Sequence, residues 1–137
     1  MKTDRRTQLR EVAFLLLFRL DFYPHQDMAG QIKDFFEGEE EFTDAEKEAV
    51  GNKVLLITEL SDEIDEALNK VSVGWKVKRM SRVDLTILRL AYYEIKYDAN
   101  VPVSSAINEA VELAKSYGEE NSPSFVNGIL AKVVKDE

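Results

Sequence analysis

The chain has 137 residues, 45% of them hydrophobic and 32% charged, and its formal net charge at pH 7 is −8. This length suffices for one domain with a sizeable core that needs no disulfide or metal to stabilise it. The sequence contains no cysteine, which excludes disulfides, thiolate metal sites and a cysteine nucleophile. A single histidine, His25, gives no basis for an imidazole metal site or a catalytic triad, so we expect neither a metal nor a cofactor.

The charge is distributed unevenly along the chain. Residues 1–19 hold five basic and two acidic groups, and residues 20–69 hold three basic and fifteen acidic ones. Residues 70–97 are basic again, with seven basic and two acidic groups, whereas residues 98–137 hold three basic and seven acidic groups. This alternation indicates a dipolar surface with a local anion-binding region, not a general polyanion binder.

No N-terminal stretch has the pattern of a signal peptide, and the longest apolar run, from Val12 to Phe18, is far too short to span a bilayer. We therefore expect a cytoplasmic protein without a membrane segment.

The first predicted helix runs from about Arg5 to Phe22 and ends at Tyr23-Pro24, because a residue before proline avoids the helical region. Its apolar positions recur at helical spacing: Leu9, Val12, Ala13, Leu16, Leu17 and Leu20. A short second helix covers roughly Asp27 to Glu37.

A capping box at Thr43-Asp44-Ala45-Glu46 predicts the start of a long third helix that continues to about Val71. Gly74 breaks this helix. We expect the following Trp75 to fill the junction between two halves of the fold.

The fourth predicted helix is capped by Ser81 with Asp84 and extends to about Tyr97. The fifth covers residues 104–117 and ends at Gly118, in the position after a helix where glycine is favoured.

The sixth predicted helix starts at Ser122-Pro123, yet it contains Asn127-Gly128, a pair that is typical of hairpins. Glycine inside a helix costs about 1 kcal/mol relative to alanine. We explain it by a close helix crossing at Gly128, where a side chain would not fit.

These elements predict an all-α helical bundle of about six to seven helices. We expect a single domain over residues 1–137, with two three-helix halves, approximately 1–73 and 74–137, that share one core.

No catalytic constellation emerges from the sequence. The motifs of nucleotide-binding loops and zinc proteases are absent, and acidic pairs such as Glu109 and Glu112 are typical of a solvated helix face. The residues thus predict a protein that is not an enzyme.

A stronger candidate is a ridge on the first helix, where Arg6, Arg10, Phe14 and Phe18 lie four residues apart. Cations for phosphates and flat rings for bases are what single-stranded RNA binding requires. In the alternative interpretation, the arginines only keep the first turn soluble and the two rings belong to the core.

Five stretches of the chain have a distinctive sequence: the basic "RRTQLREVAFLLLF", then "GWKVKRM" and "DLTILRLAYYEI", and finally "SAINEAVELAKSYG" followed by "SPSFVNGIL". Together they resemble the NusB family of bacterial transcription antitermination factors. The resemblance is strong over residues 75–134 and weak over residues 24–72. It implies an all-helical fold of two three-helix halves and a function without catalysis.

The resemblance also implies a nucleic-acid ligand, the single-stranded boxA element of ribosomal RNA leaders. The residues that would bind this RNA are Arg5, Arg6, Arg10, Phe18, Asn121, Ser122 and Phe125. The family commonly has Tyr where this chain has Phe18, which keeps the stacking ring but removes a hydroxyl. The free N–H groups at the start of the sixth helix would suit a phosphate.

By the same resemblance, the protein partner would be the small-subunit ribosomal protein NusE, and the pair would act on the transcription elongation complex with RNA polymerase. We expect Tyr93, Glu94 and Tyr97 of the fourth helix to form the partner-binding face. A homodimer also remains possible, because nothing in the sequence decides between monomer and dimer.

Two other functions remain open. NusB-like domains also form the N-terminal part of certain ribosomal RNA cytosine methyltransferases; no catalytic cysteine or nucleotide-binding strand is present here, so only an isolated domain of that kind would fit. The other is a protein-binding helical adaptor in which the arginines have no ligand.

Overall fold

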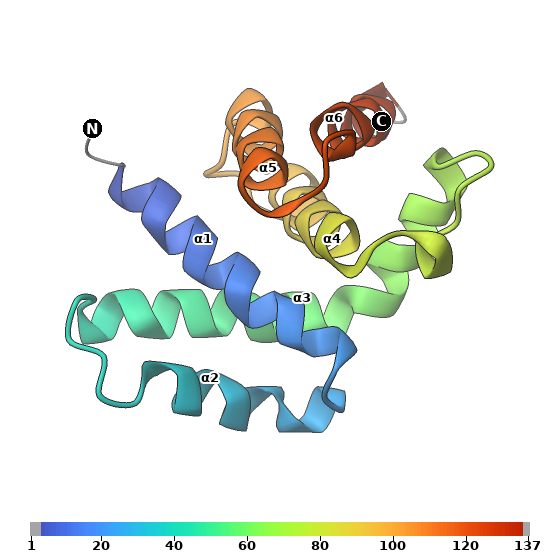
Figure 1. Ribbon diagram of the computed structural model, residues 1–137. Coiled ribbons are helices and arrows are strands. Elements are labelled where there is room, and N and C mark those ends of the chain that lie inside the picture. Colours follow the sequence, from blue (N-terminus) through green and yellow to red (C-terminus); the bar gives the residue numbers. More distant parts are fainter. Residues whose placement is uncertain (1–3, 136–137) are drawn as a thin grey trace. The chain divides into compact units, whose positions relative to one another are not determined.

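The computed structural model describes residues 4–135, which contain six α-helices and no strand (Figure 1). The all-helical prediction is confirmed. The chain divides into two compact units, one ending at Leu60 and the next starting at Ser61. This division falls inside a helix and not at the expected boundary near Gly74, because the third helix continues from one unit into the next.

The first unit contains α1 (Arg5–Phe18), α2 (Met28–Phe36) and the first part of α3 (Asp44–Val71). Two short 3-10 turns, Arg19–Asp21 and His25–Asp27, connect α1 to α2. The apolar residues predicted at helical spacing in α1 are buried from Val12 onward, together with apolar side chains of α2 and α3: Met28, Ile32, Val50, Val54 and Ile57.

The long helix α3 begins as its sequence predicts. The Thr43 hydroxyl accepts a hydrogen bond from the Glu46 N–H at 3.1 Å, and the Glu46 carboxylate accepts one from the Thr43 N–H at 2.9 Å. This reciprocal capping box satisfies two backbone donors that a helix start leaves without partners. The helix then runs for 28 residues to Val71.

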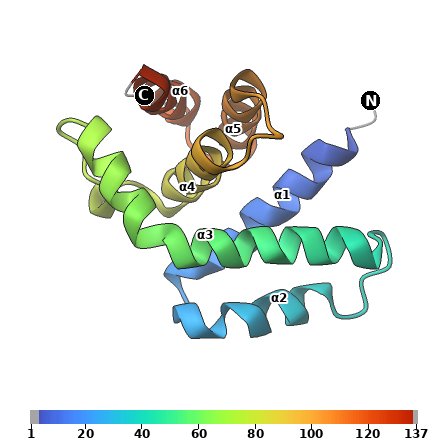
Figure 2. The ribbon, with the colours of Figure 1, turned by 180° about the vertical axis from the view of Figure 1, so that it is seen from behind.

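The second unit contains the end of α3, a 3-10 turn at Val77–Arg79, and three further helices that pack on one another (Figure 2). These are α4 (Arg82–Tyr97), α5 (Val103–Tyr117) and α6 (Ser122–Lys135). The Ser81 hydroxyl caps α4 by accepting a hydrogen bond from the Asp84 N–H at 3.0 Å. Arg89 of α4 binds Asp65 of α3 through two parallel hydrogen bonds of 2.8 and 2.7 Å, which link the two helices by a paired charge.

The predicted close helix crossing at Gly128 is wrong. Asn127 and Gly128 are both exposed, and a Cβ atom added at Gly128 would meet nothing within 4 Å. The tight position is Gly118, where an added Cβ would lie 2.5 Å from Ser122 Oγ and 2.8 Å from the Ala114 carbonyl oxygen. The backbone turn between α5 and α6, not a helix crossing, therefore requires glycine.

The expectation that Trp75 fills a buried junction is also wrong. The side chain follows Gly74, whose φ of +83° favours glycine, and 46% of Trp75 remains exposed. The loop that carries it is thus part of the surface of the second unit.

Candidate nucleic-acid interface

Helix α1 begins with an ordered cap that places its arginines on the first turns. The carboxylate of Asp4 accepts a hydrogen bond from the Arg6 N–H at 3.1 Å, and the helix starts at Arg5. The negative charge of an aspartate at this position also interacts favourably with the positive end of the helix dipole. The predicted RNA-binding arginines therefore lie on a well-formed helix.

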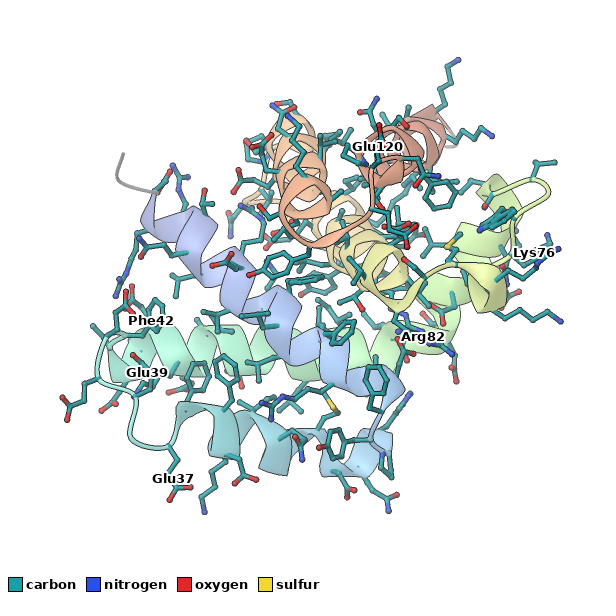
Figure 3. All side chains as sticks on the ribbon, viewed as in Figure 1. Glu37, Glu39, Phe42, Lys76, Arg82 and Glu120 are labelled. Atoms are coloured by element: carbon teal, nitrogen blue, oxygen red, sulfur yellow. The ribbon has the colours of Figure 1, made fainter. Side chains whose placement is uncertain are left out.

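Arg5 is held by the first turn of α3 and by the loop that precedes it, in which Figure 3 labels Phe42. Its guanidinium donates two hydrogen bonds to the Glu46 carboxylate, at 2.8 and 2.7 Å, and one to the Glu41 carbonyl oxygen at 3.0 Å. The same group lies 4.6 Å from the centroid of the Phe42 ring. The bidentate pair, helped by the Thr43 N–H, lowers the pKa of Glu46 to about 2, and it raises the pKa of Arg5.

Arg6 differs from its neighbour. Its side chain is 85% exposed, and its ion pair with Asp4 is long, at 3.9 Å. Arg10 is half-buried. Of the three arginines, Arg6 is thus the one whose guanidinium is most open to a phosphate.

The aromatic end of the predicted ridge is only partly accessible. Phe14 is buried, with 2% exposed, so for this ring the core interpretation holds. Phe18 is half-buried, and its ring lies 6.4 Å from that of Phe14 and 5.2 Å from that of Phe22. Phe22 itself is 60% exposed and was missed as a candidate. Its position after the last turn of the apolar stripe and two residues before Pro24 is the signal that could have indicated an exposed ring.

At the start of α6 the three predicted RNA-binding residues differ in exposure. Asn121 is exposed and Phe125 is half-buried, whereas Ser122 is only 1% exposed. The Ser122 hydroxyl accepts a hydrogen bond from the Glu119 N–H at 2.9 Å and stabilises the turn after Gly118. The expectation that Ser122 lies at an RNA-facing surface is therefore not met by its side chain.

An open groove of about 440 Å³ lies beside this helix start. It is lined by residues of α5 and α6: Asn108, Val111, Glu112, Lys115, Pro123, Ser124 and Asn127. Asn127 is exposed next to Gly128 and forms part of this lining. The candidates on α1 belong to the first unit, with the three arginines in the first two turns and Phe18 at the last residue of the helix. The candidates around the start of α6 belong to the second unit.

The predicted partner face on α4 has two accessible residues of the three. Tyr93 and Tyr97 stack with their ring centroids 5.7 Å apart, and Tyr97 is 48% exposed. Burial, together with the nearby Asp98, raises the pKa of Tyr93. Glu94 is 1% exposed, so its side chain is not accessible on the expected partner-binding face.

Within residues 4–135, no three or more His, Asp or Glu side chains gather in a way that could hold a metal ion. Over the same residues, no helix has the length and apolar character needed to cross a membrane.

Comparisons with known proteins agree over most of the chain. The model of the NusB family matches residues 7–135. A transcription antitermination protein NusB from Lachnoclostridium phytofermentans is 46% identical over 129 residues, which cover 94% of this chain and 98% of that protein.

Solved structures are similar as well. The T. maritima NusB structure superposes with a TM-score of 0.88 at 34% identity and covers 100% of this chain and 94% of its own. A structure described as the antitermination factors NusB and NusE in complex with dsRNA has a TM-score of 0.84 at 25% identity, with 96% of this chain and 97% of that chain covered. From the family match over residues 7–135 and the identity of its relatives, we conclude that this chain belongs to the NusB family.

Proposed function

We propose that this protein is a transcription antitermination factor that binds single-stranded boxA-type RNA of ribosomal RNA leaders together with the ribosomal protein NusE. It would support read-through by RNA polymerase in the cytoplasm and would catalyse no reaction. The observation that carries the proposal is the 46% identity to a protein named for transcription antitermination over nearly the full length of both chains. A second support is the similar structure whose description names NusB, NusE and RNA together.

On the RNA side, the proposal assigns phosphate contact to Arg6 and Arg10 and a supporting role to Arg5. Arg6 is 85% exposed at the first turn of α1, where the backbone N–H groups also favour an anion. Arg5, paired with Glu46, fixes the start of α1 against the first turn of α3. Half-buried Phe18 and exposed Phe22 are rings near the end of α1 that a base could contact.

In the second unit, Asn121 and Phe125 remain candidates for RNA contact, while Ser122 supports the turn that presents them. The partner face would be formed by Tyr93 and Tyr97. Tyrosine rings with an exposed edge are common in protein interfaces, since each supplies a large apolar surface and one hydroxyl. Buried Glu94 would act on this face by positioning α4.

The proposal is tested by titrating labelled boxA-like RNA with the full chain, with and without the ribosomal partner, over a series of salt concentrations. Each phosphate contact to a single strand contributes about 0.7 to the slope of log affinity against log salt. We expect Arg6→Ala to flatten the slope by about this amount. Lys33→Ala is the matched control, because Lys33 is an exposed cation of the same unit on α2.

Equal slopes for Arg6→Ala and the unmodified protein would remove α1 from the RNA site. An absence of RNA binding at any salt, alone or with the partner, would overturn the proposed function in favour of a protein-binding adaptor.

A further inference from the structure

The stretch between Glu66 and Asp84 has an unusual composition for this acidic protein. Residues 67–83 contain five basic side chains and no acidic one, although the whole chain has 26 acidic and 18 basic residues. It also contains the only tryptophan of the chain. We call residues 72–79 the tryptophan loop.

The tryptophan loop is held in place by its own contacts. The Ser72 hydroxyl donates a hydrogen bond to the Trp75 carbonyl oxygen, and the Asn69 side chain accepts one from the Val77 N–H at 2.8 Å. Met80, with 5% exposed, anchors the end of the loop in the core. The position of Trp75 is thus set by the second unit itself and does not depend on a ligand.

The side chains of this loop combine a flat ring with cations. The Arg79 guanidinium lies 5.2 Å from the centroid of the Trp75 ring, and 46% of the tryptophan is still exposed. Lys78 is exposed, and so is Lys76, whose ammonium donates a hydrogen bond to the Asn69 carbonyl oxygen at 3.2 Å. Figure 3 shows Lys76 at the connection between α3 and α4.

We propose that the tryptophan loop is a second contact surface for single-stranded RNA, with a base stacked on Trp75 and phosphates bound by Lys76, Lys78 and Arg79. Proteins that bind single strands combine a basic surface with aromatic side chains on which bases stack. An indole fixed at the surface loses little conformational entropy when a base covers it. An acidic protein segment would use the cations but has no need of an exposed flat ring. The inference rests on the proposed RNA-binding function. It adds a contact surface in the second unit, whereas Arg6 lies in the first.

The single tryptophan makes this surface directly observable. The full chain is titrated with a fluorescein-labelled single-stranded RNA carrying the boxA-like sequence, and binding is followed by anisotropy. Tryptophan emission is followed in parallel with the same RNA without the label. We expect the emission of Trp75 to be quenched in proportion to the bound fraction, because a stacked base quenches indole fluorescence.

Variants separate the ring from the cations. Trp75→Ala should weaken binding about five- to a hundredfold without changing the salt slope, and Trp75→Phe should retain most of the affinity. Lys76→Ala with Lys78→Ala should flatten the slope by about 1.4, which corresponds to two phosphate contacts. The matched control is Lys132→Ala with Lys135→Ala, since both lysines are exposed at the end of α6 in the same unit. Circular dichroism melting verifies that each variant is folded.

RNA binding that leaves the tryptophan emission and the slope of the Lys76/Lys78 variant unchanged would overturn this inference and leave the proposed function intact. Failure of the RNA to bind at all would overturn both. Quenching of Trp75 by poly-glutamate as strong as by the RNA would assign the loop to an acidic protein segment and would also overturn the inference.

Discussion

The start of α1 and the start of α6 are the two regions where RNA-binding residues were expected, and both contain neighbours with opposite roles. In α1, Arg5 is paired within the unit while Arg6 is 85% exposed. Near α6, Ser122 is buried in a turn while Asn121 is exposed. The accessibility of a side chain to a ligand is therefore set by the tertiary contacts of that side chain and not by its residue type alone.

The two regions differ in the kind of force that holds the inner residue. Arg5 is held by charge, in an exposed ion pair that solvent and salt can weaken. Ser122 is held by close packing, because the space between it and Gly118 does not admit even one added carbon atom. Changes at α6 should therefore affect stability, whereas changes at α1 should affect ligand affinity and its dependence on conditions.

The largest expected effect is that of Gly118→Ala. The new Cβ would lie 2.8 Å from the Ala114 carbonyl oxygen, a backbone atom that cannot move without disturbing the end of α5. We expect a loss of about 1 to 3 kcal/mol in the free energy of unfolding. Thermal denaturation followed by circular dichroism measures it, and an unchanged melting temperature would show that the turn can relax.

A smaller effect of opposite sign is expected for Gly128→Ala. Nothing lies within 4 Å of the added Cβ, and alanine lowers the conformational entropy of the unfolded chain. The variant should be more stable by up to about 1 kcal/mol. A decrease in stability would mean that Gly128 is in close contact after all, and the contrast with Gly118 would disappear.

Glu46→Gln tests the electrostatic region. Glutamine can still accept the capping hydrogen bond from the Thr43 N–H, but it removes the charge that holds Arg5. If Arg5 then becomes available to RNA, the salt slope of binding should steepen by about 0.7. Arg5→Ala in the unmodified background should leave the slope nearly unchanged. A flatter slope for Arg5→Ala would show that this arginine already contacts a phosphate despite its ion pair.

The smallest effect concerns pH. The folded state lowers the pKa of Glu46 from 4.5 to about 2, so its contribution to stability is present above pH 4.5 and is lost as the pH falls toward 2. The difference in melting temperature between the unmodified protein and Glu46→Gln should therefore shrink over this interval. We expect the change to be slight because the pair is exposed to solvent. A difference that stays constant down to pH 2 would contradict the assignment.

Much of the fold could be predicted because its signals are local. The capping box at Thr43 and the helix cap at Ser81 each involve a partner three residues away, and the helix periods repeat within a few turns. The predicted end of the first helix is less accurate: α1 ends at Phe18, and a 3-10 turn covers Arg19–Asp21 before Tyr23-Pro24. Helix α5 ends at Tyr117, directly before Gly118, as its sequence predicts. The arginines at the start of α1 could likewise be identified as candidates from their spacing.

The helices, their order, the family resemblance and the residue types available for binding can thus be inferred from the amino-acid sequence. Which of these side chains are accessible follows from the tertiary contacts. Arg5 and Glu46 are 41 residues apart, Glu94 is polar yet buried, and Trp75 is aromatic yet exposed. The physical reason is that such contacts depend on how distant segments meet in space, and helical periodicity specifies a face of a helix but not what covers that face.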